Sequence, residues 1–152
     1  MKFVYDDGGR KGAGRRGEAR DCVCRAIAIA TARPYAEVYD ALQDRCYGLR
    51  FGRDKLAVSV AMGRKFGARD GVPRKAYDPY LRDLGAEWTP TMRIGSGCKV
   101  HLRDGELPMG RLIVSVSRHL CAVIDGVIHD TFDPSRGGTR CVYGYWKFGA
   151  TG

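Results

Sequence analysis

The sequence predicts one α+β domain, in which N-terminal helices pack on a C-terminal antiparallel β-sheet. The chain has 152 residues, which suffices for one domain with a hydrophobic core and is short for two domains. Apart from a short run at the start, the helical segments precede residue 85 and the β-rich runs follow residue 110. Helices followed by strands, without alternation, are typical of α+β proteins. We therefore assign residues 1–152 to a single domain.

The first twenty residues predict a strand and a loop. Residues 2–5 (KFVY) have the composition of a short edge strand. Residues 6–20 are rich in glycine and in Lys and Arg, and this composition supports neither a stable helix nor a packed strand. We expect a flexible basic loop over residues 6–20.

A helix is predicted over residues 22–32 (CVCRAIAIATA), because alanine-rich sequence propagates helix well and Asp21 is a good N-cap. This segment is nearly apolar all round, so we expect it to be buried at the centre of the molecule. Pro34 ends this helix and begins a second one over residues 34–47.

The middle of the chain has weaker signals. Residues 48–73 are rich in Gly and Arg and predict irregular structure, with one helical turn near residues 56–62. A third helix is predicted over residues 74–84 and ends at Gly85. Pro79 inside this segment predicts either a kink or a later start.

The C-terminal half predicts an antiparallel sheet. Asp125 and Gly126 stand between two β-rich runs and form the strongest short hairpin signal, a two-residue Asp-Gly turn. The strands are predicted at residues 111–117, 120–124, 127–131 and 141–148. If the first of these strands continues regularly, Ser117 and His119 lie on one polar face of it.

Neither a membrane protein nor a metalloprotein is predicted. No window approaches the run of roughly 18 apolar residues that spans a bilayer, and the start of the chain lacks the apolar core of a secretory signal. We therefore expect a cytoplasmic protein whose six cysteines are reduced. No pair of cysteines has the C-x-x-C spacing of a zinc site, so we expect no metal and no cofactor.

The chemistry of the sequence centres on Cys22. It follows Asp21 at the first turn of a buried helix, where free main-chain N–H groups and the helix dipole favour a thiolate. An apolar filler of the helix face is the structural alternative. Cys24 is the competing nucleophile, but it is rotated by about 200° on the helix, so both thiols cannot face one partner.

The register of the predicted hairpin brings two further side chains together, those of His119 and Asp130. With Asp125-Gly126 as the turn, Asp130 lies diagonally from His119 on the same face of the hairpin, so its carboxylate can accept from the imidazole. The same alternation places His129 on the other face. Asp133 is an alternative partner, expected beyond the end of the strand. Cys22 would attack a carbonyl, His119 would hold and transfer the proton, and Asp130 would orient His119.

Two stretches resemble the papain-like cysteine peptidase superfamily. The stretches contain DCVCRAIAIAT at residues 21–31 and RHLCAVIDG with IHDTFDP at residues 118–134. These motifs are similar to motifs of small papain-like proteins from bacteriophages and their hosts. The resemblance implies a papain-like α+β fold with the groove between helices and sheet, and a host cytoplasm for a phage-encoded chain. It implies Cys22 as nucleophile, His119 as base and Asp130 as third member. The chain departs from the family in having no Gln before Cys22, so the second oxyanion donor is unidentified.

These features predict a cysteine hydrolase, a peptidase, isopeptidase or amidase that acts through a thioester acyl-enzyme on a protein or peptide substrate. The alternatives are an inactive papain-like interaction protein and a nucleic-acid-binding module. The net charge of +9, the loop at residues 6–20 and the basic residues at 50–75 could form a basic surface for nucleic acid. No helix-turn-helix, zinc finger or RNA-binding aromatic signature accompanies that charge, so we expect no nucleic-acid partner.

Overall fold

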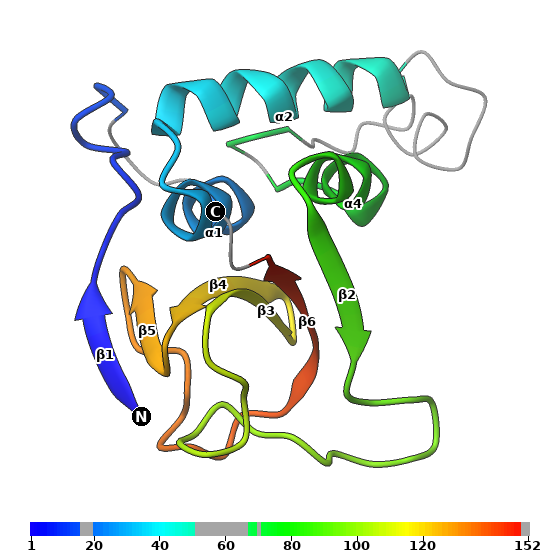
Figure 1. Cartoon of the computed structure of the whole chain (residues 1–152). Coiled ribbons are helices and arrows are strands. Elements are labelled where there is room, and N and C mark those ends of the chain that lie inside the picture. Colours follow the sequence, from blue (N-terminus) through cyan, green and yellow to red (C-terminus); the bar gives the residue numbers. More distant parts are fainter. Residues whose placement is uncertain (16–19, 51–66, 70, 150–152) are drawn as a thin grey trace.

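The computed structural model describes residues 1–15, 20–50, 67–69 and 71–149, with helices on one side of a twisted sheet (Figure 1). The helices of this part are α1 (Cys22–Thr31), α2 (Tyr35–Arg50) and α4 (Arg74–Asp83). The strands are β1 (Lys2–Tyr5), β2 (Ala86–Pro90), β3 (Arg111–Val116), β4 (His119–Ile124), β5 (Val127–Asp130) and β6 (Val142–Phe148). The prediction of an α+β fold is confirmed.

The sheet is mixed, which corrects the prediction of an antiparallel one. Its strand order is β1-β5-β4-β3-β6-β2, and every neighbouring pair is antiparallel except β1 with β5, which is parallel. Hairpin turns force the strands they join to run antiparallel. No turn joins β1 to β5, because they lie at opposite ends of the chain (Figure 1), so the direction of β1 was not readable from local sequence.

The three predicted helices are present. α1 is the central helix, and seven of its ten residues are buried, as its apolar composition predicted. α2 extends three residues further than expected, to Arg50. α4 begins at Arg74 with Pro79 inside it, which excludes the later start. The helical turn expected near residues 56–62 lies outside the described residues.

Asp21 occupies the N-cap position of α1, as predicted, but it does not cap the helix through its side chain. Its side chain makes no capping hydrogen bond to α1, because other partners described below take up the carboxylate. In the loop expected over residues 6–20, residues 6–15 form turns, where Asp7 accepts hydrogen bonds from the main-chain N–H groups of Gly9 and Lys11, each at 2.9 Å. Residues 16–19 lie outside the described part.

Strand β2 was not predicted. The segment AEWTP has five residues, includes a Glu and a Pro, and shows little alternation of apolar and polar positions. It is held at the edge of the sheet by pairing with β6, and the Trp88 ring packs on Trp146 with a centroid separation of 4.2 Å. Gly144 in β6 is required there, since a Cβ atom at this position would lie 2.3 Å from the Trp88 ring.

Two hairpins build the centre of the sheet. The register predicted around Asp125 and Gly126 is confirmed, with Ala122 opposite His129, and both turn residues have positive φ, at 48° and 80°. The expectation that one regular strand continues to His119 is wrong. The chain reverses at Ser117–Arg118, so that Val116 pairs with His119 at the start of β4.

The sheet separates two hydrophobic clusters. The larger one, on the helix side, joins α1, α2 and α4 to Trp146 and Leu120. The smaller one, on the other face, is covered by the segment between β2 and β3, through Leu102 and its neighbours. The site described next lies where the helical layer meets one end of β4.

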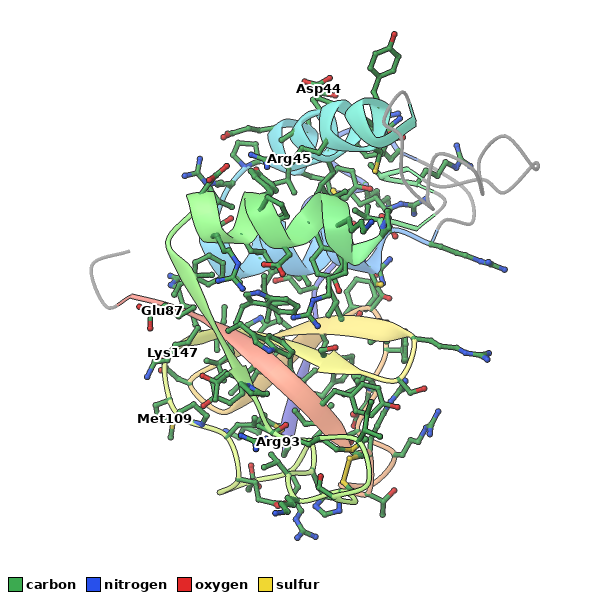
Figure 2. The ribbon with its side chains drawn as sticks, turned by 90° about the vertical axis from the view of Figure 1, so that its right-hand side faces the viewer. Asp44, Arg45, Glu87, Arg93, Met109 and Lys147 are labelled. Atoms are coloured by element: carbon green, nitrogen blue, oxygen red, sulfur yellow. A yellow bond between two sulfur atoms is a disulfide. The ribbon has the colours of Figure 1, made fainter. Side chains whose placement is uncertain are left out.

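One disulfide links Cys98, in the segment between β2 and β3, to Cys141, directly before β6 (Figure 2). The expectation that all cysteines are reduced is therefore wrong for this pair, whereas Cys22, Cys24 and Cys121 are free thiols. The two Cα atoms lie 5.8 Å apart, within the usual range for a disulfide. This proximity arises from tertiary packing across 43 residues of sequence, which no local pattern reports.

None of the described helices combines the length and the apolar character needed to cross a bilayer.

Candidate active site

Cys22 and His119 meet between the helical layer and the sheet. Cys22 is the first residue of α1 and is half-buried, and His119 is the first residue of β4. The two side chains line the same cavity, and the His119 side chain and the main-chain N–H of Leu120 lie close enough to the Cys22 thiol to lower its pKa. Because the helix starts at Cys22, main-chain N–H groups of the first turn also point toward this region without partners in the helix.

His119 is tied to Asp130 on the neighbouring strand. Its Nε2 lies 2.6 Å from Oδ2 of Asp130, and the two side chains are 9% and 4% exposed. The second carboxylate oxygen accepts a hydrogen bond of 2.7 Å from the main-chain N–H of Thr131. Since Asp130 occupies Nε2, the ring nitrogen left for the Cys22 thiol is Nδ1. The structure therefore brings Cys22, His119 and Asp130 together, with His119 between the thiol and the carboxylate.

The electrostatics of this trio favour an ion pair of thiolate and imidazolium. Burial alone would raise the pKa of Cys22, but the hydrogen bonds from His119 and Leu120, with the positive charges of His119 and Arg25, bring it below its ordinary value of 9.0. Burial alone would lower the pKa of His119, but hydrogen bonds and charge from Asp130 and Cys22 raise it to about 9. Both directions favour a charged nucleophile at neutral pH.

Cys24 lies in a different environment. Its side chain is fully buried, and its thiol donates a long hydrogen bond of 3.8 Å to the carbonyl oxygen of Tyr35. Burial raises the pKa of the Cys24 thiol to about 12, so it remains protonated. The two thiols lie two residues apart on one helix. They differ in the direction in which their side chains point and in their protonation state.

The other two candidates are engaged elsewhere. Asp133 Oδ1 accepts a hydrogen bond of 2.9 Å from the main-chain N–H of Ser135. His129 faces β1, where its Nδ1 lies 3.5 Å from Asp6 Oδ2. The partner that His119 takes in the structure is Asp130.

Arg25 is a residue of the site that the sequence analysis missed. Its guanidinium forms an ion pair with Asp21 and lies 3.6 Å from Oδ1 of Asp130. Asp21 is 1% exposed and also accepts from the Tyr35 hydroxyl at 2.6 Å and pairs with Arg10 at 3.1 Å. Arg25 thereby connects the start of α1 to the carboxylate behind His119. A lone Arg on an otherwise apolar, buried helix was the available signal, because buried charges require partners.

Phe132 covers the imidazole. Its ring centroid lies 5.1 Å from that of His119, and the side chain is about half exposed at 49%. The ring shields one side of His119 and its bond to Asp130 from water, which strengthens a charged hydrogen bond.

An open cavity of about 580 Å³ gives access to the thiol and the imidazole. This volume lies within the range of roughly 300 to 1,000 Å³ that is typical of ligand sites. The groove, as we call this cavity, is lined by Arg20, Cys22, Val23, Gly71, Val72, Pro73, Tyr77, Ser115, Val116, Arg118, His119, Leu120 and Tyr143. Asp130 lies behind His119 and does not line it.

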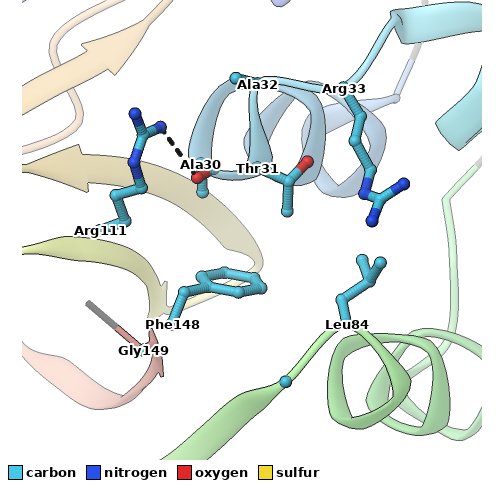
Figure 3. Close-up of a pocket in the computed structure, with 9 residues that line it drawn as sticks. Ala30, Thr31, Ala32, Arg33, Leu84, Arg111, Phe148 and Gly149 are labelled. Carbon is cyan, nitrogen blue, oxygen red and sulfur yellow. Dashed lines mark hydrogen bonds between the residues drawn. The ribbon is translucent and has the colours of Figure 1, made fainter. Parts of the chain in front are cut away.

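A second cavity, of about 450 Å³, lies at the opposite end of α1 (Figure 3). Leu84 and Phe148 form apolar walls, and Arg111 donates a hydrogen bond of 3.2 Å to the carbonyl oxygen of Ala30 near the helix end. Its lining has no cysteine, histidine or carboxylate. It therefore offers no nucleophile or base, and the candidate chemistry belongs to the N-terminal end of α1.

Two other expectations concern metals and a basic surface. Across the described ranges, no three His, Cys, Asp or Glu side chains gather in a way that could hold a metal ion. Most of the basic stretch at residues 50–75 lies outside the described residues. In the described part of this stretch, the Arg74 guanidinium lies over the Trp88 ring, 4.4 Å from the ring centroid. Its Nε lies 3.6 Å from Oδ2 of Asp78.

Comparison with known proteins adds no family to this geometry. No protein-family model matches the chain, and no match was found among curated proteins or among solved structures.

Proposed function

We propose that the protein is a cysteine hydrolase that cleaves a peptide, isopeptide or related amide bond through a thioester acyl-enzyme. One observation carries the proposal: Cys22 and His119 line one cavity, and Nε2 of His119 lies 2.6 Å from the buried carboxylate of Asp130. A nucleophile, a base and a group that orients the base form the constellation of covalent acyl transfer. The groove opens onto the nucleophile and the base.

We further propose that the chain is a papain-like enzyme. A Cys at the start of the central helix, a His at the start of one strand and an Asp at the end of the next follow the order of that superfamily. The helix that begins with Cys22, α1, lies against the sheet in Figure 1, and His119 begins strand β4 of that sheet. Both the sequence motifs and the arrangement of the helices and strands therefore support the proposal.

The reaction begins with attack of the Cys22 thiolate on the scissile carbonyl carbon, which forms a C–S bond and moves the carbonyl π electrons onto oxygen. As the tetrahedral intermediate collapses, the C–N bond breaks and His119 gives its proton to the departing amine. The product is a thioester on Cys22. Water then attacks the thioester, His119 accepts a proton from that water, and the acid leaves as the thiolate re-forms.

Tyr77 is our candidate for the oxyanion donor that the missing Gln leaves open. Its side chain, from α4, lines the groove together with Cys22 and stands close enough for the thiolate charge to affect it. Burial, with that negative charge, raises the pKa of the Tyr77 phenol, so it stays protonated and can donate. The main-chain N–H of Cys22 would be the other donor.

The experiment that tests the function is labelling with iodoacetamide and a peptidyl vinyl sulfone, followed by mass spectrometry of each cysteine. The variants are Cys22→Ala, Cys24→Ala and His119→Ala, with circular dichroism to check folding. We expect Cys22 to label fastest near neutral pH, Cys24→Ala to leave this labelling intact and His119→Ala to slow it. Labelling of Cys22 no faster than that of Cys46 would exclude the nucleophile assignment.

A second step separates a hydrolase from an inactive papain-like interaction protein. Incubation with p-nitrophenyl acetate should release nitrophenol in a burst, and intact mass should show one acetyl group on Cys22 that is later lost by hydrolysis. An interaction protein would label with alkylating agents but would neither form nor hydrolyse the acyl-enzyme. A nucleic-acid-binding module would bind oligonucleotides with strong salt dependence, unaffected by Cys22→Ala.

A further inference from the structure

Apart from the nucleophile Cys22, the charged side chains among the described residues that line the groove are cationic. Beside the Cys22 thiolate, Arg20 and Arg118 line it together with His119, whose raised pKa of about 9 keeps it protonated at neutral pH, and none of the described Asp or Glu residues lines it. Arg20 precedes the nucleophile by two residues, and Arg118 immediately precedes His119. The two guanidinium groups therefore come from the helix side and the sheet side of the reacting pair.

Arg20 and Arg118 differ from the other arginines around the site. Arg25 pairs with Asp21, and Arg74 lies 3.6 Å from Asp78. Residues 1–15, 20–50, 67–69 and 71–149 supply no ion-pair partner to either Arg20 or Arg118, and both side chains are exposed. Nothing in those ranges neutralises the two charges, which leaves both guanidinium groups available to a ligand.

The main chain at both arginines is anchored. The N–H of Arg20 donates a hydrogen bond of 2.7 Å to the carbonyl oxygen of Arg69. Arg118 occupies the tight turn between β3 and β4 with a φ of 56°, a conformation that few residues other than glycine adopt readily. Each long side chain thus starts from a fixed point at the edge of the groove and can reach a ligand over the thiol.

The walls between the two arginines are apolar and aromatic. They include Val72, Pro73, Val116, Tyr77 and Tyr143. Such walls suit a polypeptide segment, whose main chain and carbon-rich side chains pack against them, better than they suit a bare phosphate backbone. A cleavable bond adjacent to an acidic side chain would fit both the walls and the charge.

We propose that the groove selects a polypeptide segment with a carboxylate side chain beside the scissile carbonyl, and that Arg20 and Arg118 bind this carboxylate. The inference rests on the proposed function, since it names the substrate class of the same site. Guanidinium groups pair with carboxylates through two parallel hydrogen bonds, which gives geometric selectivity in addition to charge. Neutral and basic segments would lack a partner for the two arginines and would bind more weakly.

The test compares the rates at which Cys22 reacts with iodoacetate and with iodoacetamide, which differ in charge but share the leaving group. A second matched pair is a peptidyl vinyl sulfone with Asp or Asn next to the electrophile. The variants are Arg20→Gln, Arg118→Gln and the double variant. Arg93→Gln is the control, because it removes the same charge on the side of the sheet away from the helices (Figure 2). His119 is intact in all of them, so its own attraction for anions cancels.

We expect the double variant to lower the anionic-to-neutral rate ratio by about three- to tenfold, with partial effects of the single variants and none of Arg93→Gln. The difference should shrink at 0.5 M salt, since ions screen exposed charges. If Cys22 reacts fast but the ratio is equal in all variants, the substrate class is wrong and the hydrolase proposal stands. If Cys22 reacts no faster than the other free thiols, the hydrolase proposal fails, and this inference fails with it.

One more outcome would replace the polypeptide by a different anion. An oligonucleotide that protects Cys22 from alkylation through Arg20 and Arg118, combined with equal rates for the Asp and Asn vinyl sulfones, would assign the two arginines to phosphate. That result would overturn the acidic-segment proposal.

Discussion

His119 Nε2, at the first residue of β4, lies 2.6 Å from Asp130 Oδ2, at the last residue of β5. The two strands are joined by a two-residue turn, so the separation of imidazole and carboxylate is set by hairpin register. The bond orients the ring and keeps it charged, which in turn supports the thiolate of Cys22. The predictions below test this chain of effects.

Replacement of Asp130 should lower the pKa of His119. In Asp130→Asn, His119 loses the negative charge that keeps it protonated, so its pKa should fall from about 9 by about 1 to 3. An NMR titration of the His119 ring protons measures this directly. Asp133→Asn is the matched control, because the Asp133 carboxylate accepts from the main chain at Ser135 and should leave the His119 titration unchanged.

The activity should depend on pH in a bell-shaped manner. On the acid side the rate should fall as Cys22 is protonated, and this limb should lie below the ordinary thiol value of 9.0 because the pKa of Cys22 is lowered. On the alkaline side His119 must keep its proton to give to the leaving group, so the rate should fall as pH rises through about 9. A kcat/KM profile with an amide substrate measures both limbs. A rate that keeps rising above pH 10 would contradict the role of His119.

Removal of Arg25 should destabilise the protein strongly. Arg25→Gln leaves Asp21 and Asp130 as buried carboxylates without their shared cation. Breaking a buried ion pair costs about 3–5 kcal/mol when the remaining charge has no other partner. Because Asp21 keeps Arg10 and Asp130 keeps His119, we expect a loss at the lower end, about 3 kcal/mol. Urea unfolding measures the loss.

Arg33→Gln is the control for that experiment. Arg33 pairs with Glu37 on the surface of α2 at 2.9 Å, and both side chains are about half exposed. Exposed pairs of this kind contribute less than about 1 kcal/mol. Equal losses in the two variants would show that Arg25 is not a buried bridge.

Tyr77→Phe should separate catalysis from nucleophile reactivity. The variant keeps the ring that packs edge-on against Trp146 and removes only the hydroxyl. Loss of one oxyanion donor should lower kcat by roughly a hundredfold, with little effect on KM or on alkylation of Cys22. Tyr143→Phe, which also lines the groove, should leave kcat nearly unchanged. Unchanged turnover in Tyr77→Phe would remove this tyrosine from the oxyanion site.

Short-range patterns were sufficient for several elements. The apolar helix from Cys22, the hairpin around Asp125 and Gly126, and the diagonal placement of Asp130 and His119 each follow from residues close together in the chain. The preference for Cys22 over Cys24 also follows from helix geometry, and the structure gives the two thiols opposite pKa directions. The helix, the hairpin and the placement of Asp130 beside His119 were predicted correctly because helix periodicity and hairpin register are local rules.

Other expectations failed because local propensity was overridden. Aspartate is a common capping residue, but the Asp21 carboxylate forms ion pairs with Arg25 and Arg10 instead. The strand expected to continue past Ser117 reverses there instead, and β2 forms despite weak propensity because β6 supplies a pairing edge. The partner is distant in the sequence for β2, whereas Asp21 is engaged by Arg25 four residues along the helix and by Arg10, and the strand from Arg111 ends in a local turn.

The amino-acid order by itself determined that a helix starting at Cys22 would precede a hairpin carrying His119 and Asp130. Only the tertiary structure decided that the thiol meets the imidazole, that Arg25 bridges two buried carboxylates, that Cys98 joins Cys141, and that Arg20 and Arg118 share one groove. The reason is physical: dihedral preferences and side-chain periodicity act over a few residues, whereas these contacts arise when the helical layer packs on the sheet and brings distant segments together.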